Sequence, residues 1–90
     1  MAPAITAAKI VNKRGLHARA SAKFVEMACK FQAEITVTRD GTSVSGRSIM
    51  GLMMLGVPQG AELMISADGS DASDALAALT RLIAEGFHED

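Results

Sequence analysis

The chain has 90 residues, 49% of them hydrophobic, and a formal net charge of −1, which suits one domain over residues 1–90. Near-neutral charge and the lack of Trp and Tyr argue against a nucleic-acid binder. No segment has the length and apolar character of a signal peptide or membrane span, so we expect a cytoplasmic protein without membrane insertion. The single cysteine, Cys29, provides no intrachain disulfide or thiolate metal site and is expected to be buried in a helix.

The first half of the chain predicts a strand, a helix and a hairpin. Residues 5–11 form the expected strand. Both of its alternating sets contain apolar residues, and the set with Ala8 and Ile10 is favoured as the inward-facing one. Residues 17–31 then show helical spacing of apolar residues, which predicts a core-facing stripe of Ala20, Phe24, Ala28 and Phe31, with Val25 beside it. Residues 33–38 alternate as a strand does, and the Asp40-Gly41 pair predicts a tight turn into a second strand over 42–45.

Residues 47–56 predict a short helix, capped by Ser48 and ended by Gly56. Apolar side chains surround this helix, and a two-turn helix on a small domain cannot bury every side. One interpretation is a helix sunk in the core, with methionines filling gaps. The favoured one turns Leu52 and Leu55 inward and leaves an exposed docking patch, for which methionine is well suited, formed by Ile49, Met50 and Met53.

The end of the chain predicts a strand over 61–67, a turn at Asp68-Gly69 and a last helix. Asp71 and Asp74 suit its start, and Gly86 its end. Its apolar stripe is expected to contain Leu76, Leu79, Ile83 and Phe87, while His88 is assigned no role. The order of elements, β-α-β-β-α-β-α, favours an α+β fold in which helices cover one face of an antiparallel sheet.

His17 lies where the first strand has ended and the helix begins, with Arg19 two residues later. Unpaired N–H groups at a helix start can hold an anion, and a neutral imidazole nitrogen is a competent phosphoryl acceptor. The alternative is a purely structural role, in which His17 caps the helix and Arg19 is a solvated surface charge. Clustering of positive charge favours phosphoryl chemistry, because residues 9–30 hold one acid, Glu26, and six of the nine basic residues: Lys9, Lys13, Arg14, Arg19, Lys23 and Lys30.

Two motifs together resemble a known family. Gly15-Leu16-His17-Ala18-Arg19 and the segment from Arg47 to Gly56 are similar to those of HPr, the histidine phosphocarrier of the bacterial phosphoenolpyruvate-dependent phosphotransferase system, over residues 5–87. The resemblance implies an open-faced β-sandwich with a four-stranded antiparallel sheet and three helices on one face. It also implies that His17 accepts a phosphoryl group from Enzyme I on Nδ1 and passes it to an EIIA-type domain.

The same resemblance assigns roles to other residues. Arg19 and the backbone N–H groups of Ala18 and Arg19 would bind the phosphoryl oxygens, and Ile49, Met50 and Met53 would dock partners. Ser48 matches the serine that HPr kinase/phosphorylase modifies in many relatives, a role compatible with helix capping. No cofactor or metal is implied, and we expect a monomer and a carrier that reacts without being an enzyme.

Alternatives remain open within and outside this family. Ala20 stands where many members have proline, and this change with the Asn-Lys-Arg start of the loop at residues 12–14 would fit a nitrogen-related regulatory carrier. A different class is a protein-interaction module that uses the methionine patch without phosphoryl chemistry. The pairing of His17 with Arg19 argues against that module.

Overall fold

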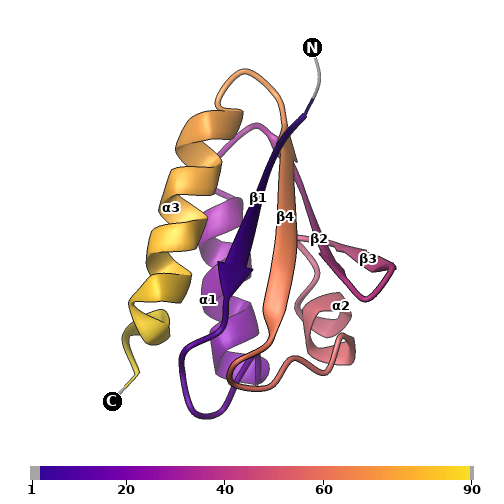
Figure 1. Ribbon diagram of the computed structural model, residues 1–90. Coiled ribbons are helices and arrows are strands. Elements are labelled where there is room, and N and C mark those ends of the chain that lie inside the picture. Colours follow the sequence, from indigo (N-terminus) through magenta and orange to yellow (C-terminus); the bar gives the residue numbers. More distant parts are fainter. Residues whose placement is uncertain (1–2, 90) are drawn as a thin grey trace.

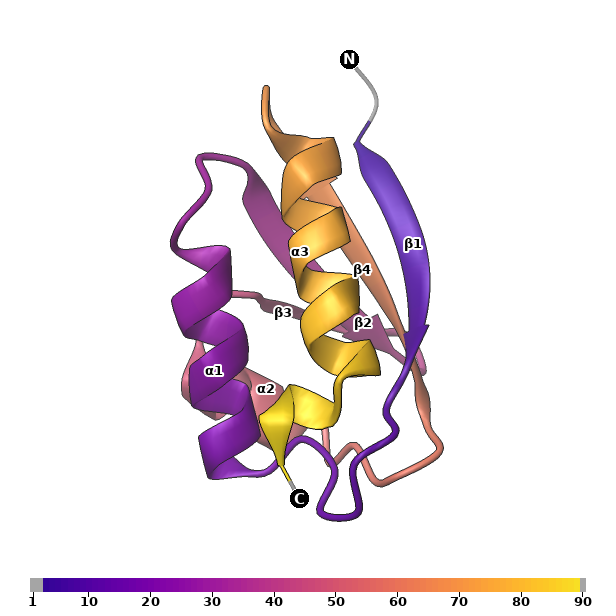
Figure 2. The same ribbon diagram turned by 90° about the vertical axis from the view of Figure 1, so that its left-hand side faces the viewer.

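The computed structural model describes residues 3–89, in which four strands form one antiparallel sheet in the order β1-β4-β2-β3 (Figure 1). The elements are β1 (Ala4–Lys9), α1 (Ala18–Ala28), β2 (Glu34–Arg39), β3 (Thr42–Ser45), α2 (Ile49–Met54), β4 (Glu62–Asp68), α3 (Ala72–Ala84) and a 3₁₀ turn, η1 (Gly86–His88). Helices α1 and α3 lie side by side across the sheet, and α2 contacts α1 and β3 (Figure 2). The expected open-faced α+β sandwich is confirmed.

β4 is the last strand in the chain but lies between β1 and β2, so the order of strands in the sheet differs from their order in the sequence. Alternation along β4 turns Leu63, Ile65 and Ala67 into the core and leaves Met64 on the open face. The register sets Ile65 opposite Val37 of β2, so two buried β-branched side chains meet in the centre of the sheet. No helix within residues 3–89 is long and apolar enough to cross a bilayer.

Most of the predicted core of the first half is confirmed. Ala8 and Ile10 are buried, and the α1 stripe of Ala20, Phe24 and Ala28 is fully buried. The predicted helix was too long, however, because α1 ends at Ala28 and Phe31 lies beyond it, partly buried. The prediction for Cys29 was wrong, since this residue is the C-cap of α1 and is exposed. Ala28, four residues after Phe24, takes the inward position, and its neighbour faces solvent.

Asp71 lies at the N-cap of α3, as expected, but makes no capping hydrogen bond. Its carboxylate instead accepts from the backbone N–H groups of Gln32 and Ala33, at 2.8 Å each. The bond from Gln32 is the main cause that holds the pKa of Asp71 below its ordinary value. Asp71 therefore ties the start of the last helix to the segment between α1 and β2.

The C-terminal end of the chain departs from the predicted helix. α3 ends at Ala84, so Phe87 is not part of a continuous helical stripe, although its side chain is fully buried. Gly86, Phe87 and His88 have φ angles of +63°, +56° and +60°, a left-handed conformation that is uncommon for residues other than glycine. This run turns the chain back, so that η1 lies close to α1 (Figure 2).

Candidate functional site

His17 is held at the N-cap of α1 by a tightly packed loop. Gly15 has a φ of +66°, and a Cβ atom there would lie only 2.2 Å from the carbonyl oxygen of Val57. The next N–H, that of Leu16, donates to the same oxygen at 2.9 Å, and the Leu16 side chain is buried. These contacts fix the backbone just before His17. The glycine and leucine of the motif therefore have a structural reason to precede the histidine.

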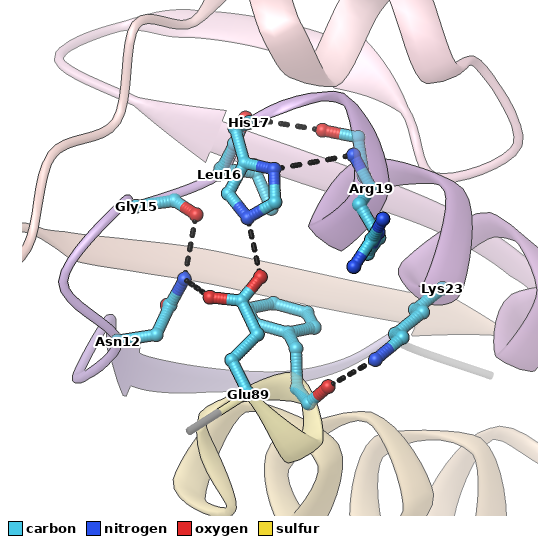
Figure 3. Close-up of polar contacts among 9 residues, drawn as sticks. Asn12, Gly15, Leu16, His17, Arg19, Lys23 and Glu89 are labelled. Carbon is cyan, nitrogen blue, oxygen red and sulfur yellow. Dashed lines mark hydrogen bonds and ion pairs between the residues drawn. The ribbon is translucent and has the colours of Figure 1, made fainter.

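The two ring nitrogens of His17 have different partners (Figure 3). Nδ1 accepts a hydrogen bond from the backbone N–H of Arg19, with 3.2 Å between the nitrogens. Nε2 forms a hydrogen bond with the Glu89 carboxylate. A neutral imidazole has one donor and one acceptor nitrogen, so the N–H of Arg19 requires Nδ1 to carry the lone pair and Nε2 the proton. Nδ1 is therefore the nucleophilic atom in this arrangement.

Glu89 and Asn12 form a network under the imidazole (Figure 3). The Asn12 amide donates to the second Glu89 carboxylate oxygen at 3.0 Å and to the carbonyl oxygen of Gly15 at 2.8 Å. Burial of the Glu89 carboxyl opposes its ionisation, but hydrogen bonds from Asn12 and His17 outweigh this effect and hold the pKa of Glu89 below its ordinary value. An ionised carboxylate thus faces Nε2.

Lys23 connects α1 to the reversed end of the chain. Its ammonium nitrogen donates to the carbonyl oxygen of Phe87 at 2.6 Å, two residues before Glu89. The Phe87 ring is inserted into the core, so the backbone there is held from both sides. Together these contacts place Glu89, which is 72 residues from His17 in sequence, at the start of α1.

The predicted basic cluster is only partly assembled. Four of its six members line one hollow beside the site, together with His88 and Glu89: Lys13, Arg14, Arg19 and Lys23. Lys9 and Lys30 do not line this hollow. Glu26 is the one acid near His17 in sequence, and Glu89 was not predicted as a neighbour, because proximity along the chain cannot reveal a partner at the opposite end.

The donors expected to bind a phosphoryl group lie next to Nδ1. The Arg19 N–H already points at that nitrogen, and the N–H of Ala18 finds no acceptor among residues 3–89. The N–H of Ala20 also finds none there, so a residue without an N–H, such as proline, would lose no hydrogen bond at this position. The Arg19 side chain is exposed, and its guanidinium forms no ion pair within the described part of the chain.

Ser48 and α2 form a second region of interest. The Ser48 hydroxyl oxygen accepts from the N–H of Gly51 at 2.9 Å, which confirms the expected N-cap, and Gly56 follows the helix with a φ of +62°. Leu52 is fully buried and Leu55 partly so. The helix is therefore not sunk in the core. Four large apolar side chains are exposed on it: Ile49, Met50, Met53 and Met54.

Met54 was not predicted as part of the docking patch, although its side chain is the most exposed of the four, at 78%. Asn12 and Glu89 were also missed as neighbours of His17. A buried asparagine in a loop carries no periodic signal, and the position of Glu89 depends on the chain reversal at residues 86–88.

Comparison with known proteins agrees with this geometry. A family model described as the PTS HPr component phosphorylation site matches residues 6–85. The phosphocarrier protein HPr of Neisseria meningitidis serogroup A is 48% identical over 81 residues, which cover 90% of this chain and 91% of that protein. The crystal structure of HPr from Thermoanaerobacter tengcongensis superposes with a TM-score of 0.92 at 45% identity, covering 97% of this chain and 98% of that one. The crystal structure of HPr from Bacillus anthracis superposes with a TM-score of 0.88 at 38% identity, covering 92% of this chain and 99% of that one.

The chain belongs to the HPr family of the phosphotransferase system. Membership in this family supports the role of a phosphocarrier in that system.

Proposed function

We propose that His17 accepts a phosphoryl group from phosphorylated Enzyme I on Nδ1 and passes it to an EIIA-type domain. The main support for this proposal is the environment of Nδ1, which lies at the start of α1 and accepts a hydrogen bond from the N–H of Arg19. Those groups and the positive end of the helix dipole favour an anion bonded to this atom. The neighbouring hollow adds positive charge from Arg19 and Lys23.

The transfer needs positioning and positive charge more than acid–base catalysis. The lone pair of Nδ1 forms a bond to phosphorus, while the bond from phosphorus to the donor breaks and leaves its electron pair on the donor. Once Nδ1 is bonded to phosphorus, the N–H of Arg19 is released from it and can donate to a phosphoryl oxygen. The free N–H of Ala18 and the Arg19 guanidinium supply further donors. The protein is thus a reactant that carries the group between partners.

We propose that exposed apolar residues of α2 dock both partners. Ile49, Met50 and Met53, joined by Met54, lie on the helix that packs against α1, the element that begins at His17. An exposed apolar group of this kind, on a helix that contacts α1, suits a surface that must fit more than one partner.

Ser48 is proposed as a regulatory site for HPr kinase/phosphorylase. Its side chain is partly exposed, and among residues 3–89 its oxygen accepts a hydrogen bond from the N–H of Gly51 and makes no other. A phosphate on Ser48 would place about two negative charges beside the apolar residues of α2 and oppose docking of a phosphorylated partner.

The proposal is tested by incubating the protein with phosphoenolpyruvate and Enzyme I and measuring its intact mass. We expect the addition of one phosphate that is labile in acid and stable in base, as phosphohistidine is. The His17→Ala variant should gain none, whereas His88→Ala, which removes the only other imidazole, should gain it normally. Phosphate retained by His17→Ala would refute the proposal.

A further inference from the structure

We infer that Glu89 is a positioning residue that holds the His17 ring in the tautomer and orientation in which Nδ1 is the nucleophile. This inference rests on the proposed role of His17 and extends it to a residue at the opposite end of the chain. Its basis is the contact between the Glu89 carboxylate and Nε2, together with the Asn12 amide on the second carboxylate oxygen (Figure 3).

Glu89 selects the tautomer because an ionised carboxylate can only accept hydrogen bonds. Nε2 must therefore carry the ring proton, which leaves the lone pair on Nδ1. The Arg19 N–H favours the same tautomer from the other side of the ring, because it can only donate and therefore needs a lone pair on Nδ1. The two contacts together restrict rotation of the imidazole about the Cα–Cβ and Cβ–Cγ bonds of His17. Loss of Glu89 would free the ring to turn and to exchange its proton between the nitrogens.

The contact is built into the fold and is more than a chance meeting of surface side chains. The His17 and Glu89 side chains are only 16% and 17% exposed. Asn12, which holds Glu89, is itself buried and is fixed by its second bond, to the carbonyl oxygen of Gly15. The backbone that carries Glu89 is anchored by the Phe87 side chain in the core.

Glu89 also lies where charge develops during the transfer. When Nδ1 bonds to phosphorus and the donor bond breaks, Nε2 keeps its proton and the ring gains positive charge. The Glu89 carboxylate faces that N–H on the side of the ring away from Nδ1, so it can stabilise the charged ring. Its repulsion of the phosphoryl group is offset by cations of the hollow, which come from the loop before His17 and from α1: Lys13, Arg14, Arg19 and Lys23. His88 of η1 is the remaining titratable group that lines this hollow.

The test compares wild type, Glu89→Ala and Glu89→Gln, with Glu85→Gln as the matched control. Glu85 lies at the end of α3 and pairs with Arg81 and His88, so this control removes the same charge without touching His17. The ¹⁵N chemical shifts of the His17 ring report the tautomer, and rapid mixing with phosphorylated Enzyme I reports the rate of phosphorylation. Circular dichroism checks that each variant is folded.

In wild type and Glu85→Gln, we expect shifts typical of a proton on Nε2 alone. In Glu89→Ala the shifts should move toward an average of the two tautomers, and phosphorylation should slow by up to about 100-fold, the scale expected when a reacting group loses its productive geometry. Glu89→Gln can still accept from Nε2 through its amide oxygen, so it should restore the tautomer and part of the rate.

The inference is overturned if Glu89→Ala keeps the wild-type tautomer, or if its tautomer changes while its rate does not. Neither result would affect the proposed function, provided that wild type is phosphorylated on His17. If wild type is not phosphorylated, the proposed function fails, whereas the ¹⁵N shifts alone still decide whether Glu89 controls the ring.

Discussion

The backbone nitrogen of Arg19 lies 3.2 Å from Nδ1 of His17, so the helix that follows the histidine presents an N–H to the atom proposed to carry the phosphoryl group. This contact separates two contributions of Arg19. Its N–H depends only on the backbone of α1, whereas its guanidinium reaches the same region as an exposed side chain. Substitution of the side chain should therefore weaken phosphoryl transfer without abolishing it.

Arg19→Ala should accept phosphate from Enzyme I about 10- to 100-fold more slowly than wild type, equivalent to about 1.4–2.7 kcal/mol in the activation free energy. Rapid-quench measurement of the initial rate checks this expectation. Arg81→Ala is the matched control, because Arg81 is an exposed arginine on α3 whose side chain pairs with Glu85. Complete loss of phosphorylation in folded Arg19→Ala would contradict a supporting role.

The docking role of α2 is tested by Met53→Glu. Because the Met53 side chain is 44% exposed, the melting temperature should change little, but binding to Enzyme I should weaken by about 1–3 kcal/mol. Met64→Glu is a close control, since Met64 is 43% exposed on the open face of the sheet and lies outside α2. Equal weakening by both substitutions, in titration calorimetry, would refute a docking surface on α2.

Ser48→Asp should slow phosphorylation of His17 at low Enzyme I concentration and approach the wild-type rate at saturation. The added charge acts on partner affinity in this account, and not on the chemical step. Ser48→Ala removes the cap without adding charge and should cost about 0.5–2 kcal/mol in the free energy of unfolding. Ser70→Asp, in the exposed loop before α3, controls for charge alone. A defect of Ser48→Asp that persists undiminished at saturation would show that Ser48 acts on the His17 site.

Asp71 should make stability depend on pH. Its pKa is lowered in the folded state, so its contribution is present above the ordinary aspartate value of 3.8 and is lost as the pH falls through the lower folded value. Urea unfolding should therefore show Asp71→Asn to be less stable than wild type at about pH 6, with a smaller difference at about pH 2.5. Asp68→Asn is the control, because Asp68 is exposed and its side chain accepts no hydrogen bond within residues 3–89. A difference for Asp71→Asn that stays constant with pH would contradict this role.

Sequence patterns predicted the element order and most of the core because local periodicity reflects which side of each helix or strand faces inward. The α1 stripe around Phe24 and the cap at Ser48 are examples. Predictions of side-chain position were less accurate near the ends of helices, because α1 and α3 end earlier than the sequence pattern suggested. Cys29, expected to be buried in a helix, is the exposed C-cap of α1. Phe87, expected in the stripe of the last helix, is buried as predicted, but it lies in the chain reversal after α3.

The candidate site could be predicted only for residues close to His17 in sequence. The position of Arg19 follows from the helix that begins at His17. Asn12 and Glu89 could not be found in the same way, because their meeting requires three successive left-handed residues and the packing of Phe87. No periodic pattern encodes such a contact across 77 residues.

Nδ1 of His17 is proposed to carry the phosphoryl group, and the most direct test of this role identifies the phosphorylated nitrogen. His88→Ala leaves His17 as the single histidine, so ¹⁵N-histidine labelling of this variant gives one imidazole to observe. After phosphorylation by Enzyme I and phosphoenolpyruvate, we expect the ³¹P–¹⁵N coupling to involve Nδ1, with Nε2 still bearing a proton. Coupling to Nε2, or a phosphate with no coupling to the imidazole, would contradict the account.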